Sequence, residues 1–274
     1  MSDWVILLPA FVMMALMIAT HTYLGLHVLA RGIIFVDLAL AQIAALGVSI
    51  AFLFGQESHG LASQAYAFGA TLIAAFGFAK LRELPNKTAR EVTIGCVYVV
   101  ATALSIVILS RSSQGMEELK AMFNGNILWV QWQEITVVAI AYLVLSVLHF
   151  IYYRQFKALS FKPDEAEENQ VNRPSFLWEF LFFATFALTI TLAVNVAGVL
   201  LVFAFLIIPA FSASIIIESF LNRLLVGWSM GILGSAIGLW LSLWADLPVG
   251  ATVVSVLGMV PIIAILIRVF KRGG

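Results

Sequence analysis

The chain has 274 residues, of which 62% are hydrophobic and only 11% are charged, and its mean hydropathy is +1.03. Soluble domains carry about 25% charged residues, so this composition excludes an ordinary soluble protein and places the chain in a lipid bilayer. The formal net charge is zero, which argues against a nucleic-acid partner. The single cysteine, Cys96, has no partner in the chain, so no disulfide framework is expected.

Apolar segments long enough to cross about 30 Å of hydrocarbon recur along the chain. We expect an all-α polytopic membrane protein with eight or nine transmembrane helices, folded as one transmembrane domain over residues 1–274. The first helix is expected to be a span and not a signal peptide, because no basic region precedes it. The expected spans cover residues 4–29, 34–54, 61–80, 91–110, 133–153, 175–195, 197–210, 225–244 and 250–268.

Basic residues indicate the orientation of the spans, because lysine and arginine favour the cytoplasmic side. With nine spans, 13 of the 15 basic residues fall on one face, and only Arg111 and Lys120 fall on the other. This bias predicts an external N-terminus and a cytoplasmic C-terminus. Residues 154–174 form the longest polar loop, and residues 111–126 are amphipathic enough for a short surface helix.

The sequence offers little for catalysis. It contains no GxxxxGK[ST] phosphate loop and no HExxH or CxxC motif. The four histidines are scattered, and His21 and His27 lie about 120° apart on a helix. We therefore expect transport and not enzymatic activity, with no ATPase motif of its own and no cofactor.

Six segments occur in an order that is typical of one transporter family. The most specific is GVLLVFAFLIIPAFSA at residues 198–213, and the others are FVDLALAQIAALGVSIAF after Arg31, EVTIGCVYVVATALSIVIL, MFNGNILWV, KALSFKPDEA and DLPVGATVV. Together they cover about residues 20–260. On these segments the chain resembles the membrane permease subunit of the zinc/manganese-type ABC importers of bacteria.

This resemblance implies a multi-pass, type II-like permease in the bacterial inner membrane, surrounded by lipid. It implies a homodimer that works with a cytoplasmic ATP-binding subunit and an extracytoplasmic metal-binding protein. Divalent metal ions, with zinc first and manganese or iron as alternatives, would cross by alternating access. Two other functions stay open: a permease of the same architecture for a metal chelate or other small cargo, and an ion-coupled secondary transporter. The latter predicts inverted repeats, and no convincing repeat is visible.

The segment after Pro209 is the expected contact with the ATPase. Proline interrupts helical hydrogen bonding, so a helix ending near Pro209 is expected. By resemblance, the following segment docks into the ATP-binding subunit through small and polar residues, while an ordinary loop between two spans is the alternative. The residues expected in this coupling element are Pro209, Ser212, Ala213, Ser214, Glu218 and Arg223.

Asp37 and Gln42 are the first candidates for the transport pathway. The family usually has Asp and His four residues apart here, whereas this chain has Asp37 and, in the place of the histidine, Gln42. A separation of five residues is about 140° on a regular helix, so the pair shares a face only if the helix begins after Asp37 or is locally distorted. Asp37 is the candidate metal ligand, but a position at the helix start or an ion pair with Arg31 fits it as well. Gln42 fits either the pathway or a hydrogen bond between helices.

The remaining polar residues inside spans are open to two interpretations each. His21 and Asn195 are candidates for the pathway, although a hydrogen-bonded core histidine and a capping or packing asparagine are favoured. Glu91 is interpreted as a boundary residue paired with Arg90. A glycine series at residues 227, 231, 234 and 238 forms one stripe, which predicts close packing either within the chain or across a dimer.

Overall fold

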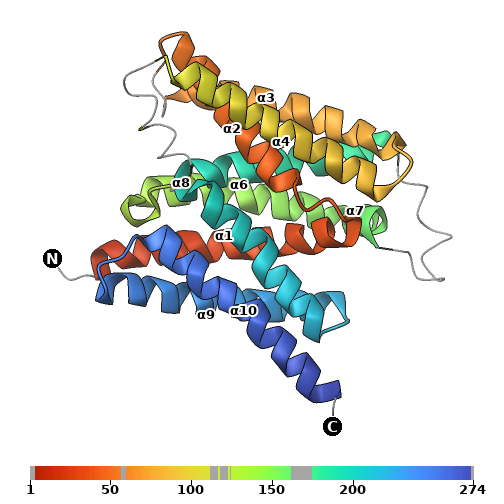
Figure 1. Ribbon diagram of the computed structural model, residues 1–274, viewed down its shortest axis with the longest axis vertical. Helices are drawn as coiled ribbons and strands as arrows, with labels where there is room; N and C mark the ends of the chain where they lie inside the picture. The colour runs from red at the N-terminus through yellow and green to blue at the C-terminus, as the bar shows by residue number, and fades with distance from the viewer. Residues whose placement is uncertain are drawn as a thin grey trace. The chain divides into compact units, whose positions relative to one another are not determined.

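The computed structural model describes residues 4–56, 60–111, 117, 123, 125–161 and 175–272. Every element of secondary structure within these residues is a helix (Figure 1), which confirms the expected all-α class. Most of the surface helix expected in residues 111–126 lies outside the described residues, as does the polar loop from residue 162 to residue 174. The described start of that loop forms a short helix, α7 (Tyr153–Ser160).

Eight of the described helices are long and apolar enough to cross a membrane. Two short 3₁₀ turns, η1 (Leu81–Glu83) and η2 (Ile127–Trp129), lie between them. The eight helices are α1 (Trp4–Arg31), α2 (Val36–Leu53), α3 (Leu61–Lys80), α4 (Lys87–Leu109), α6 (Trp132–Ile151), α8 (Phe176–Ile216), α9 (Phe220–Trp244) and α10 (Val249–Arg272).

Helix α8 contains two of the expected spans. Its 41 residues would extend about 62 Å as one helix, roughly twice the hydrocarbon thickness. The break is at Gly198, where φ is 75° and ψ is 162°, a conformation essentially confined to glycine. The amide of Asn126 donates to the carbonyl of Val196 at 3.0 Å, so a carbonyl next to the break is satisfied. With this break the eight helices provide nine segments, within the expected eight or nine.

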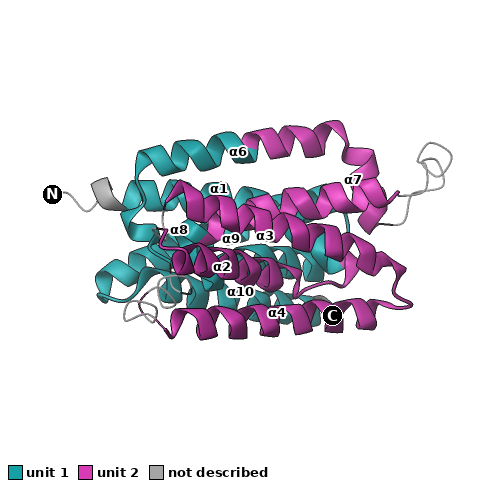
Figure 2. Ribbon diagram, turned by 90° about the horizontal axis from the view of Figure 1, so that it is seen from above, with its two compact units in different colours: residues 1–29, 123–142, 195–274 teal, residues 30–122, 143–194 magenta. Residues whose placement is uncertain are grey.

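The chain divides into two compact units, coloured separately in Figure 2. Unit 1 contains residues 1–29, 123–142 and 195–274, and unit 2 contains residues 30–122 and 143–194. Three of the four unit boundaries fall inside α1, α6 and α8, so each of these helices contributes to both units.

Unit 2 is built around α2, which packs against both α3 and α4. Small residues make this possible: a Cβ atom at Gly47 would lie 2.7 Å from the Cα of Ala67 in α3. Of the most apolar window of α2, 72% is buried, against 22% for α4. Helices α2 and α3 thus approach closely at Gly47, and the exposed apolar side chains of α4 are those that lipid would cover.

Unit 1 is packed along the glycine stripe of α9. Gly227 and Gly231 face Thr22 and Ile18 of α1 and the ring and carbonyl of Pro209, and Gly234 and Gly238 face Leu257 and Val253 of α10. A Cβ atom at Gly238 would lie 2.6 Å from the Cα of Val253. Of the two interpretations of the stripe, close packing within the chain is therefore the one that the structure confirms.

Candidate functional site

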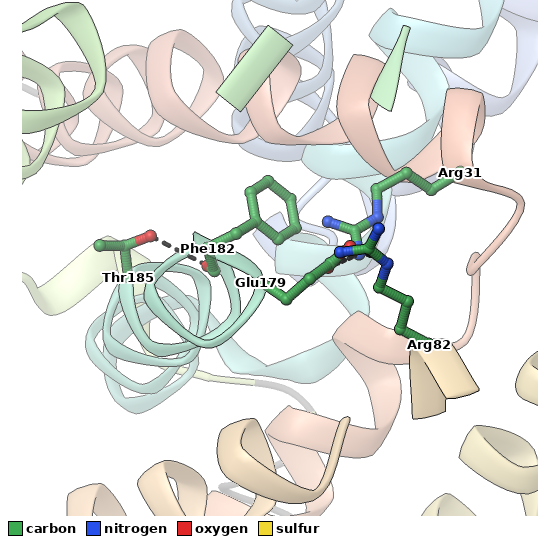
Figure 3. Close-up of polar contacts among 5 residues, drawn as sticks. All are labelled: Arg31, Arg82, Glu179, Phe182 and Thr185. Carbon is green, nitrogen blue, oxygen red and sulfur yellow. Dashed lines mark hydrogen bonds and ion pairs between the residues drawn. The ribbon is translucent and has the colours of Figure 1, made fainter. Parts of the chain in front are cut away.

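A buried ion pair in unit 2 joins the end of α1 to the start of α8 (Figure 3). The terminal nitrogen Nη2 of Arg31 donates to Oε2 of Glu179, and both side chains are only 6% exposed. The guanidinium carbon of Arg31 lies 4.6 Å from the ring centre of Phe182 and 4.9 Å from that of Phe183. Arg82 of η1 lies nearby, with its Nε 3.9 Å from Oε1 of Glu179. The Glu179 carboxylate is thus shared by two guanidinium groups, and the guanidinium of Arg31 lies over two aromatic rings.

This ion pair corrects one prediction. Arg31 pairs with Glu179 and not with Asp37, so the proposed inner ion pair of Asp37 is wrong as stated. The helix-start interpretation fares better, since Asp37 lies in the first turn of α2. Its side chain does not cap that helix, because the N-cap is Phe35 and no side-chain cap hydrogen bond forms there.

Asp37 is nevertheless an unusual group. It is 1% exposed, and its Oδ1 has no hydrogen-bond partner among the described residues. A buried acid inside a span is costly and usually serves a function. It is therefore the strongest single candidate for contact with a cargo cation in the part of the chain that the structure describes.

Gln42 does not share a helix face with Asp37. Helix α2 begins at Val36, before Asp37, so the five-residue separation places the two side chains about 140° apart. Both are buried, Gln42 at 2% exposure. Within the described residues, no group of three or more histidine, cysteine, aspartate or glutamate side chains is arranged to hold a metal ion.

His21 and Asn195 belong to unit 1. The His21 ring is fully buried; its Nδ1 lies 2.8 Å from the carbonyl of Met17 and its ring centre 6.0 Å from that of Tyr142. Nε2 has no partner among the described residues, so the expected core histidine is hydrogen-bonded on one side only. Asn195 is exposed, three residues before the break at Gly198.

The helix that carries Pro209 does not end there, contrary to expectation. It continues to Ile216, and only residues 217–219 separate it from α9. Proline removes one backbone donor but leaves the following amides able to continue the helix. The hydroxyls of Ser212 and Ser214 bond to the carbonyls of Ile208 and Ala210 at 2.7 and 2.8 Å, so these serines face their own helix backbone.

Two arginines close the end of α8. Nε of Arg223 donates to the carbonyl of Ile217 at 2.8 Å, and Nη1 of Arg268 in α10 donates to the carbonyl of Ile215 at 2.9 Å. These carbonyls lack partners in the helix, so each bond satisfies one of them. Ala213 is buried and Glu218 is exposed; of the expected coupling residues, Glu218 is thus the one most open to another protein.

Three features escaped the sequence interpretation. Glu179 was not singled out, although a lone acid at the start of an apolar span is the signal that marks it. Glu91 does not pair with Arg90 as expected: its Oε1 accepts the backbone amide of Phe35 at 2.9 Å, at the start of α2. A Gly-x-Ser-x-Gly spacing occurs at residues 227–231, but it lies inside α9, and the Ser229 hydroxyl donates to the Leu225 carbonyl at 2.9 Å. It therefore lacks the strand-to-helix turn of a nucleophile elbow.

These features define a helical membrane protein without a preformed cluster of metal-binding side chains in its described residues. The profile of the ABC 3 transport family matches residues 3–268, so the chain belongs to this family and is a metal ABC transporter permease, a transport subunit and not an enzyme.

Individual relatives agree with this assignment. The chain is 26% identical over 244 residues to the manganese transport system membrane protein MntC of Listeria monocytogenes, covering 89% of this chain and 84% of the relative. It is 23% identical over 237 residues to the chelated iron transport system membrane protein YfeC of Yersinia pestis, covering 86% and 78%. In fold it is similar to PsaBC from Streptococcus pneumoniae in complex with Fab, with a TM-score of 0.73, 19% identity, and coverage of 94% and 90%.

Proposed function

We propose that this chain is the membrane-spanning subunit of a bacterial importer that carries a divalent transition metal and is driven by separate ATP-binding subunits. The observation that supports this most directly is the family match over residues 3–268, reinforced by a fold similarity that covers nearly all of both chains. An extracytoplasmic metal-binding protein would deliver the cargo, and two copies of the chain would enclose the pathway in the inner membrane.

Asp37 is our first candidate for a cargo contact within this pathway. Its buried and unpaired oxygen is a hard ligand that suits manganese or iron better than the softest metals. Gln42 contributes a neutral amide, a weaker ligand than imidazole for zinc. Two relatives are named for manganese and chelated iron transport, which favours these metals over zinc as the first cargo to test.

The end of α8 and the start of α9 form the proposed coupling element. It comprises Pro209, Ser212, Ala213, Ser214, Glu218 and Arg223. Two arginine bonds hold the end of α8, so a push from an ATPase at Glu218 would be transmitted to the helix and, through Pro209, to the glycines of α9. This assignment places the element and the C-terminus in the cytoplasm.

The test is the metal content of cells with and without the gene, measured by elemental mass spectrometry after chelation. Manganese, iron and zinc are restored one at a time at equal free concentration. We expect one metal to fall selectively without the gene, and to recover with the wild-type gene but not with Asp37→Asn. Glu83→Gln removes an exposed carboxylate from the same unit and serves as the matched control. Unchanged metals across the panel would contradict metal-ion import.

A metal chelate is the second candidate cargo, because one relative is named for chelated iron. In that case the metal content would fall only when the chelate is supplied. A partner ATPase that lacks its phosphate-loop lysine separates both candidates from a secondary transporter. Uptake that persisted with this partner would support an ion gradient as the driving force.

A further inference from the structure

A pocket of about 280 Å³ lies in unit 2, beside the buried ion pair. Four basic side chains and one acid line it: Arg31, Arg82, Lys87, Arg90 and Glu179. Residues 158–160 at the end of α7 complete the wall. With four positive groups against one carboxylate, the pocket has an excess of three positive charges.

Two donors of this pocket have no acceptor in the part of the chain that the structure describes. Nη1 of Arg31 and Nε of Arg90 are both buried without a hydrogen-bond partner among the described residues. The Arg31 side chain is only 6% exposed, and Glu179 engages just one of its two terminal nitrogens. A buried guanidinium donor without an acceptor is costly, so these two donors hold a hydrogen-bonding capacity that no described side chain uses.

The start of α4 makes the excess of positive charge more unusual. Lys87 and Arg90 lie in its first turn, which contains no acid. The N-terminal end of a helix carries a partial positive charge that favours anions and disfavours lysine and arginine. Asn86 already caps the helix by accepting the Ala89 amide at 2.7 Å, so the two basic residues are not needed to start it. Basic residues at a helix N-terminus and buried donors without acceptors both go against the usual preferences of stable proteins. Exceptions of this kind are typical of functional sites.

The geometry points to a binding site for a phosphate group in this pocket, held by the unpaired donors of Arg31 and Arg90 and by the charge of Lys87. The planar fork of arginine matches the oxygens of phosphate, and lysine adds a point charge. The phosphate can come from two sources: the headgroup of an anionic phospholipid, or free phosphate in solution. This site is independent of the proposed metal cargo, because it involves neither Asp37 nor the coupling element.

The two sources are separated with the full chain in lipid nanodiscs. One arm measures phosphatidylglycerol retained by the protein after release from mixed phosphatidylglycerol and phosphatidylcholine nanodiscs, by native mass spectrometry. The other arm titrates inorganic phosphate into phosphatidylcholine nanodiscs and records its dissociation constant. Retention of phosphatidylglycerol alone assigns the site to a headgroup, and saturable binding of inorganic phosphate assigns it to free phosphate.

Arg90→Gln is the diagnostic variant, and Lys80→Gln is its control, because it removes one positive charge of unit 2 outside the pocket. Whichever of the two probes the wild type binds, phosphatidylglycerol or inorganic phosphate, we expect Arg90→Gln to bind it roughly tenfold more weakly. Lys80→Gln should bind it like the wild type. Arg31→Met combined with Glu179→Met removes the ion pair without leaving a lone buried charge, and it should lose binding as well. Equal binding by the wild type and Arg90→Gln, or an equal loss in Lys80→Gln, would overturn the proposal.

Discussion

The two units pack their helices by different means. In unit 1, α9 packs closely against its neighbours at glycines, which have no side chain. At Gly238, for example, the backbone of Val253 lies in close contact. Unit 2 also has a close contact at Gly47, but in addition it buries Arg31, Asp37, Gln42 and Glu179. Close packing of small residues stabilises helices in lipid without any charge, whereas buried charges cost free energy unless they are paired. Unit 1 also buries the histidines His21 and His27, but the arginine, aspartate and glutamate side chains that are buried among the described residues all belong to unit 2. The packing of unit 1 is therefore specified mainly by shape, and unit 2 carries the buried charged groups.

The largest effect is expected when the ion pair of unit 2 is broken. Glu179→Gln leaves Arg31 charged and enclosed by Phe182 and Phe183, so we expect unfolding to become easier by about 3–5 kcal/mol. The measurement is the thermal unfolding midpoint of the purified protein in detergent. Glu83→Gln, which breaks the exposed pair with Lys80, should change the free energy of unfolding by less than about 1 kcal/mol. Similar shifts of the unfolding midpoint in the two variants would mean that the buried ion pair contributes no more to stability than the exposed one.

Shape dependence in unit 1 is tested by adding one methyl group. Gly238→Ala would place a Cβ atom 2.6 Å from the Cα of Val253, and a backbone atom cannot rotate away. We expect destabilisation of about 1–3 kcal/mol. Gly258→Ala is the control, since nothing lies within 4 Å of its new Cβ, and better helix propensity should stabilise it by about 0.5–1 kcal/mol. Stability changes of opposite sign in the two variants would confirm that the glycine stripe acts through close contact. Changes of the same sign would contradict this.

Shape was easier to predict from the sequence than polarity. The spans and the glycine contacts followed from apolar length and small-residue spacing, because these signals are local and periodic. The family followed from the resemblance of six segments. The partners of Arg31 and Glu91 did not follow, because Glu179 is 148 residues from Arg31 in sequence and Phe35 is 56 residues from Glu91. The end of α8 was misplaced for a local reason: proline disfavours a helix through one missing donor, and packing against Gly227 and Gly231 holds Pro209 within it.

Asp37 offers a third test, in which stability and function should move in opposite directions. Asp37→Asn removes the charge of a buried carboxylate while keeping its shape. We expect a gain of about 1–2 kcal/mol, less than the roughly 2.5–3.5 kcal/mol assigned to a charge at the centre of a span, because Asp37 lies in the first turn of α2. Metal uptake should fall in the same variant. The two readouts are the thermal midpoint and cellular metal content, and a loss of both would indicate a structural role for Asp37.

The smallest effect is expected at the end of α8, where two arginines satisfy backbone carbonyls of unit 1. Arg268→Gln shortens the side chain that reaches the Ile215 carbonyl, and loss of this bond should cost about 0.5 kcal/mol because water replaces it. Global unfolding will barely register such a change, so the measurement is amide hydrogen exchange in the peptide that covers residues 209–219. We expect exchange there to become about twofold faster, since local opening is controlled by the bonds that close the helix end. Arg111→Gln, an exposed arginine of unit 2, should leave this peptide unchanged. Acceleration confined to Arg268→Gln would show that unit 1 also uses charge, but only where helix packing ends and backbone carbonyls need partners.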